Sequence, residues 1–75
     1  MILEREGPSP NLEELHQRCL VHGYRVGLNY STTAGGAELC VLTVWNRDDL
    51  VATFGAELVE AAALHLLVLI RWPDD

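Results

Sequence analysis

Two histidines flank a cysteine near the start of the chain, in the pattern His16-x-x-Cys19-x-x-His22. Neutral imidazole nitrogen and thiolate sulfur are the ligands that zinc prefers, so the triplet is a candidate metal site. On a helix, residues 16 and 22 lie about 9 Å apart along the axis, too far to reach one ion unless the helix end unwinds. No fourth ligand is obvious, although Cys40 or His65 could approach through the core. We therefore expect no metal site, with Cys19 in the core and both histidines at the surface or at the core boundary.

The remaining chemistry-bearing residues form no catalytic pattern. His65 stands alone in an apolar stretch, and neither Ser9 nor Ser31 lies in a nucleophile-elbow sequence. The acids at 48–49 fall in a turn, where they indicate solvated charge. The glycines at 35–36 lack the lysine and helix entry of a phosphate-binding loop. We expect no enzyme, no catalytic residue and no cofactor.

Charge sets the class of partner that the chain can attract. Eleven acidic residues against five basic ones, all arginine, give a net charge of −6 over 75 residues. Phosphate backbones attract positive surface, so this balance argues against a nucleic-acid binder. A protein partner remains open, because charged protein surfaces can complement one another. A chain of this length makes one small domain, residues 1–75, of marginal stability.

The cysteines and the apolar runs predict the compartment. Two cysteines, Cys19 and Cys40, make no disulfide framework, so we expect reduced thiols, with a single bridge as the alternative. Residues 1–6 are charged and lack the apolar core of a signal peptide. The apolar run 61–70 is about half the length that spans a bilayer. These features predict a cytoplasmic protein.

Two helices frame the chain after an arm over residues 1–8. The longer is predicted over 56–71, which is rich in Ala and Leu, with Pro73 unable to continue it. The shorter is predicted over 11–22. It starts either with Ser9 as the cap and Pro10 at the first position, or with Asn11 as the cap and Glu14 three residues later. Gly23 is its natural stop, and Leu12, Leu15, Cys19 and Leu20 fall on one side.

Between the helices the hydrophobic period changes to two. Strands are predicted over 24–31, 37–45 and 50–54, with paired glycines in the first turn. The middle strand is apolar on both faces, which places it at the centre of a sheet with strand order 1-2-3. The sequence therefore predicts an α+β domain of order α-β-β-β-α, with a three-stranded antiparallel sheet and both helices on one face.

The alternation also predicts a register and a core face. If the first hairpin pairs residues whose numbers sum to 68, Val26 faces Leu42 and Leu28 faces Cys40, which hides the apolar side of the first strand. A slip of one residue would exchange the two faces. The core face of the sheet then holds Tyr24, Val26, Leu28, Cys40, Leu42, Val44, Leu50, Ala52 and Phe54.

This arrangement leaves apolar side chains uncovered in two places. One is the sheet face away from the helices, and the other is one side of the long helix, whose last turns are apolar all round. We expect one of these surfaces to form a homodimer or a contact with another protein, and the alternative is an ordinary core edge covered by the first helix or the arm. The residues are Leu39, Val41, Trp45, Val51, Leu64 and Val68.

Element order over residues 10–70 resembles the double-stranded-RNA-binding domain fold. The sequence Val-Ala-Thr-Phe-Gly at 51–55 leading into the alanines at 61–63 is similar to that family's last strand and small-residue helix. The family grips phosphates with a lysine-rich start of its second helix. Here that position is Ala-Glu-Leu-Val-Glu at 56–60, so RNA binding is not carried over. The Gly-to-helix junction with Glu60-Ala61 also resembles compact phage and antitoxin-type domains.

The function predicted from these observations is a small acidic protein-interaction module of bacterial or phage type, self-associating and without catalysis. The alternative is a degenerate nucleic-acid-binding domain of the double-stranded-RNA-binding type, using Arg25, Arg47 and Tyr30. A small-molecule pocket between the sheet and the helices is a third option.

Overall fold

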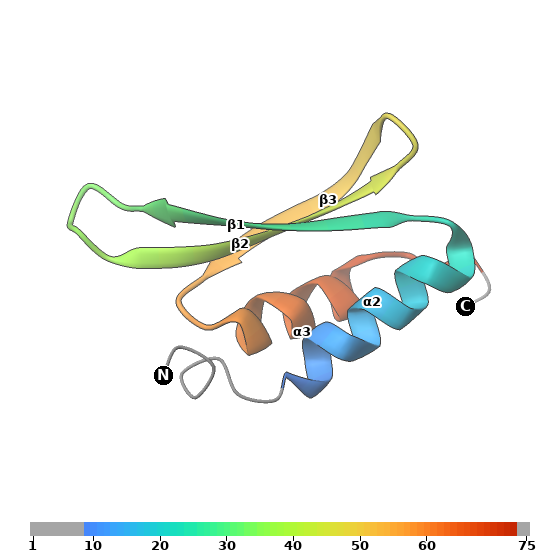
Figure 1. The fold of residues 1–75 in the computed structure, drawn as a ribbon, viewed down its shortest axis with the longest axis horizontal. Coiled ribbons are helices and arrows are strands. Elements are labelled where there is room, and N and C mark those ends of the chain that lie inside the picture. Colours follow the sequence, from blue (N-terminus) through green and yellow to red (C-terminus); the bar gives the residue numbers. More distant parts are fainter. Residues whose placement is uncertain (1–8, 74–75) are drawn as a thin grey trace.

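A computed structural model describes residues 9–73, and its elements follow the predicted α+β order of helix, three strands and helix (Figure 1). The three strands form one antiparallel sheet in the order β1-β2-β3, as predicted. Both helices lie on the same side of this sheet (Figure 1). The elements are α2 (Pro10–His22), β1 (Arg25–Thr32), β2 (Glu38–Asn46), β3 (Asp49–Ala56) and α3 (Val59–Leu69).

Helix α2 starts at Pro10 with Ser9 in the N-cap position, as in the first of the two predicted starts, but the Ser9 side chain makes no capping hydrogen bond. Asn11 does not cap; its backbone N–H donates to Oε1 of Glu60 at 2.8 Å, and its side-chain amide donates to the Glu60 carbonyl at 3.3 Å. Because Glu60 is in the first turn of α3, these bonds join the N-terminal ends of the two helices. The helices therefore begin side by side.

Gly23 ends α2 as predicted, in the left-handed conformation with φ of 76°. Its N–H donates to the Leu20 carbonyl at 3.2 Å, and the N–H of Tyr24 donates to the Cys19 carbonyl at 2.7 Å. This pair of bonds is a Schellman motif, which needs a residue that tolerates positive φ. Leu20, expected on the core side, is instead 59% exposed at this helix end.

The predicted register of the first hairpin is wrong by two residues. Val26 pairs with Val44 and Leu28 with Leu42, so the paired numbers sum to 70 rather than 68. A shift of two keeps every side chain on its face, because the side-chain period of a strand is two. The side chains predicted for the core face of β1 and β2 therefore lie on that face. Leu28, toward the end of β1, is less covered than expected, because 41% of it is exposed.

A β-bulge in the second hairpin moves residues of β3 between the faces of the sheet. Val44 pairs with Ala52 and Trp45 with Leu50, which leaves Val51 as an extra residue. Val51 was expected on the outer face but packs against the core, whereas Leu50, expected in the core, is 60% exposed. An inserted residue breaks the two-residue alternation, which explains both errors.

Helix α3 is shorter than the predicted 56–71. Ala56 still pairs with Cys40 at the end of β3, and the chain bends before the helix starts at Val59. The helix ends at Leu69, and Ile70 is already extended. The strand extends further because pairing with β2 satisfies backbone groups that a helix start leaves free. No helix within residues 9–73 is long and apolar enough to cross a membrane.

Nine side chains form the buried core of the described chain. Its centre lies where α2 and α3 meet β2, and Trp72 closes it after the chain turns back at the end of α3. Sequence reasoning did not place Trp72 in the core. The nine are Leu15, Cys19, Leu42, Val44, Ala62, Ala63, Leu66, Ile70 and Trp72.

Candidate interaction surfaces

The triplet His16, Cys19 and His22 is not gathered into a metal site. Cys19 is fully buried, His16 is exposed on α2, and His22 stacks on Trp72 with ring centroids 5.5 Å apart. Over residues 9–73, no three His, Cys, Asp or Glu side chains lie close enough together to hold an ion. The side chains thus take the structural places that helical spacing predicted for them.

The two cysteines are free thiols in different settings. Cys19 lies in the core, and this burial raises the pKa of its thiol, because a thiolate is poorly solvated there. Cys40 is half-buried on β2, with its thiol 3.9 Å from the Glu57 carbonyl. Cys40 is therefore the more accessible of the two thiols.

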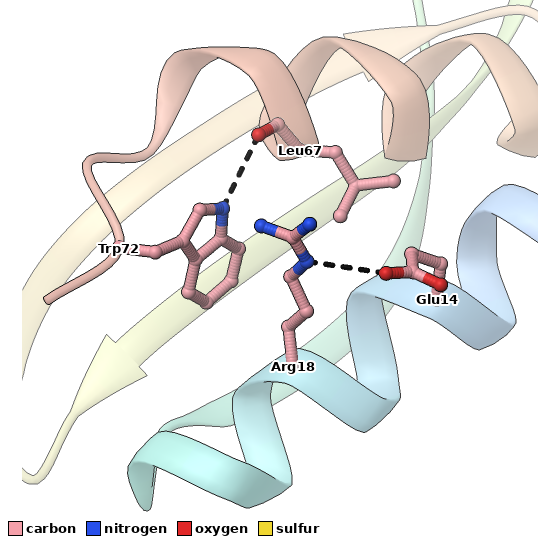
Figure 2. Close-up of polar contacts among 4 residues, drawn as sticks. All are labelled: Glu14, Arg18, Leu67 and Trp72. Carbon is pink, nitrogen blue, oxygen red and sulfur yellow. Dashed lines mark hydrogen bonds and ion pairs between the residues drawn. The ribbon is translucent and has the colours of Figure 1, made fainter. Parts of the chain in front are cut away.

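Trp72 joins the C-terminal ends of the two helices (Figure 2). Its indole N–H donates to the Leu67 carbonyl at 3.2 Å, which satisfies a group in the last turn of α3. From α2, the Arg18 guanidinium lies 5.7 Å from the ring centroid, and Nε of Arg18 is 3.1 Å from a carboxylate oxygen of Glu14. These contacts make this end of the domain a packed structural junction.

On the outer face of the sheet, Trp45 lies flat against its neighbours, so that much of its apolar surface is covered. The Trp45 ring lies over Gly27 so closely that a Cβ there would be 2.9 Å from the ring. The Arg25 guanidinium carbon also lies over this ring, 5.1 Å from the Trp45 centroid. Beside the ring, the hydroxyls of Thr43 and Thr53 are 3.0 Å apart.

Other apolar side chains of the outer sheet face also lie flat over a strand glycine. A Cβ at Gly55 would lie 3.2 Å from Val41 and 3.8 Å from Leu39, so these side chains fold over the glycine. Leu39, Val41 and Trp45 are all half-buried. The strand glycines thus allow their neighbours to lie flat, and less apolar surface faces water than the sequence suggested.

On helix α3, in contrast, apolar side chains are exposed to solvent. Leu64 is 51% exposed, Val68 79% and Leu69 54%, with Ala61 and His65 also exposed. At about 100° per residue these positions fall within one arc of about 140°. We call them the outer face of α3. One side of the His65 ring is covered, because it stacks on Phe54 with centroids 3.7 Å apart.

A third surface is a groove of about 1000 Å³ between the sheet and the N-terminal ends of both helices. Leu28 and Tyr30 of β1 line it from the sheet, Leu12 and Glu13 from α2, and Leu58 from the turn before α3. Tyr30 is 57% exposed and Leu58 69% exposed, so the groove is open to solvent. It lies between the sheet and the helices, where the third option from the sequence places a small-molecule pocket.

The residues proposed for nucleic-acid contact do not converge. Arg25 stacks on Trp45 on the outer face of the sheet, whereas Tyr30 lines the groove on the helix side. Arg47 lies in the turn between β2 and β3. The start of α3, where the RNA-binding family is basic, carries Glu57 and Glu60. The α-β-β-β-α topology is confirmed, and the family resemblance stays a prediction.

Comparison of the chain with protein-family models, curated proteins and solved structures gave no match.

Proposed function

We propose that this chain is a protein-interaction module that associates with a second copy of itself through the outer face of α3. The observation that carries the proposal is the exposure of Leu64, Val68 and Leu69 on a helix whose only charged residue is Glu60. An apolar helix face normally packs against another element, and neighbouring exposed apolar residues mark contact sites. Here the sheet and α2 cover the opposite side of the helix, where Ala62, Ala63 and Leu66 are buried, and the contact of β3 with the outer face is the stacking of Phe54 on His65.

The structure favours α3 over the outer sheet face because the two surfaces are covered to different extents. Trp45 and Val41 already lie on strand glycines, whereas Val68 is 79% exposed. Two copies related by a twofold axis present the same patch to each other. In an antiparallel pairing of the two α3 helices, the small Ala61 of each copy faces Val68 of the other, which lets the helices approach closely.

The proposed contact is short, so its affinity is expected to be modest. Residues 61–69 rise only about 12 Å along the helix axis. Interfaces that bury less than about 1200 Å² belong to the weak, transient class. Self-association is therefore expected to depend on concentration within an accessible range, rather than to be obligatory for folding.

The test compares Val68→Glu with Val21→Glu by light-scattering mass after gel filtration. The control is closely matched, because Val21 is 76% exposed and is also the second-last residue of its helix. We expect the wild type and Val21→Glu to approach twice the 8.3 kDa chain mass with rising concentration. Val68→Glu should stay at the single-chain mass. Equal masses for both variants would exclude α3 as the contact.

A further inference from the structure

We infer a second binding function for this chain. The free edge of β1 binds an extended, basic peptide segment of another protein as an added strand, and the groove beside that edge receives the peptide's side chains. Strand β1 pairs only with β2 within the described chain, so its other edge is open. Open edges accept a further strand through main-chain hydrogen bonds, with pockets beside the edge reading alternate side chains.

The backbone of β1 has the orientation that strand addition needs. The Thr33 N–H donates to the Ala37 carbonyl across the hairpin at 2.8 Å. Residues that bond to one neighbouring strand alternate with residues that face the other way. The N–H and C=O groups of Leu28 and Tyr30 therefore point to the free edge. Their side chains line the groove, so backbone bonding and side-chain recognition fall at the same residues.

Charge selects the partner. Three carboxylates line the groove, from Glu13, Glu57 and Glu60, and no lysine or arginine among the described residues does. Glu60 already accepts the Asn11 N–H, and together with Glu13 it offsets the partial positive charge at the two helix starts. Glu57, two residues before α3 begins, is exposed and adds a third negative charge to the groove lining. A peptide with apolar side chains directed into the groove and Lys or Arg beside them fits this lining.

The openness of the groove favours a peptide over a small molecule. Small-molecule sites bury most of their ligand, typically 70–90% or more of its surface. Here Leu28, Tyr30 and Leu58 are between 41% and 69% exposed, so one side of any occupant stays in water. An added strand has that property, because its outer edge and outward side chains remain solvated.

The probe is the synthetic peptide Thr-Val-Thr-Lys-Thr-Val-Thr-Lys, which has eight residues, the length of β1. Its Val and Lys side chains share one face of the added strand, because strand side chains alternate, and this face meets the groove and its carboxylates. A matched peptide carries Glu at each Lys position. Both are titrated by NMR against Val68→Glu, so that self-association through α3 does not enter the result. We expect the lysine peptide to bind at least about tenfold more tightly, and amide exchange at Leu28 and Tyr30 to slow at least about tenfold. Failure to bind, or equal binding of the two peptides, would overturn the proposal.

Two neighbouring substitutions separate the groove from the outer face. Tyr30→Asn should weaken binding of the lysine peptide, because it removes the apolar ring from the groove lining without adding a charge. Ser31→Asn, one residue along on the opposite face, should leave binding unchanged. Equal loss from both would contradict the placement. Protected Leu28 and Tyr30 amides in the free Val68→Glu protein would also contradict it, because the edge would then already be occupied.

Discussion

Arg47 occupies the one left-handed position held by a residue other than glycine in the described chain, with φ of 61°. It is the first of two residues that join β2 to β3, and tight hairpins favour glycine where φ is positive. The left-handed conformation costs an ordinary residue about 1 kcal/mol. The turn therefore holds its shape because the strands on both sides are paired.

Substituting Arg47 tests this local cost. Arg47→Gly should unfold with a free energy about 1 kcal/mol higher than Arg47→Ala, because both lose the side chain but only glycine relaxes at positive φ. Urea denaturation of the two variants measures the difference. Equal stabilities would show that the turn carries no strain.

Trp72 is the residue whose role the sequence hid. It follows an apolar helix and precedes Pro73, a context typical of a helix exit, yet it is only 4% exposed. Periodicity stops at the helix end, so it cannot indicate which way the chain turns next. A tryptophan directly after an apolar helix was the available signal, because tryptophan is strongly buried on average.

Trp72→Phe should lower the free energy of unfolding by about 1–2 kcal/mol, because it leaves the Leu67 carbonyl without its donor while keeping most of the ring packing. Trp45→Phe is the matched control, since Trp45 lies on the outer sheet face without such a bond in the described chain. Its cost should stay near 0.5 kcal/mol. The comparison is made by urea denaturation, and a larger loss for Trp45→Phe would contradict this assignment.

At the scale of the elements, a polar contact between Asn11 and Glu60 joins the starts of α2 and α3. Glu60 accepts the Asn11 N–H at 2.8 Å and so satisfies a donor that the start of α2 leaves free. Glu60→Ala should cost about 1 kcal/mol, because the bond is charge-assisted but only partly buried. Glu57→Ala should be nearly neutral, since that side chain is exposed. Thermal unfolding of both variants provides the test. Equal losses of stability would contradict a stabilising role for the bond between Asn11 and Glu60.

Sequence reasoning succeeded where a single period governs an element. Alternation in β1 and β2 gave the correct faces and strand order, and Gly23 gave the helix stop. It failed where the physics is not periodic: a shift of two residues in register leaves alternation unchanged, so Val26 was paired with Leu42 instead of Val44. The bulge at Val51 and the late start of α3 arise from sheet pairing, which local propensity does not report.

The candidate surfaces were predictable only in part, for the same reason. The apolar circumference of α3 is visible in its sequence, and it led to Leu64 and Val68. The groove required knowing where the helices start under the sheet. Predicting that Trp45 lies flat over Gly27 required the correct strand register, because the two residues lie on different strands. Contacts between elements were thus the missing information.

At the scale of the whole molecule, two copies that associate must bring like charges together. Each chain carries a net charge of −6. Raising salt from 0.1 to 1 M shortens the screening length from about 10 to 3 Å, so the dissociation constant should fall at least about threefold. Arg47→Glu, which takes the net charge from −6 to −8, should steepen this dependence. Sedimentation equilibrium measures both, and association that weakens with salt would contradict an apolar contact between acidic chains.

The most direct test of the proposed contact is a nuclear Overhauser experiment on an equal mixture of carbon-13-labelled and unlabelled protein, filtered for contacts between copies. The account predicts intermolecular contacts from the methyl groups of Leu64, Val68 and Leu69. Intermolecular contacts confined to Leu39, Val41 and Trp45, or none at a concentration where the mass is that of two chains, would contradict it.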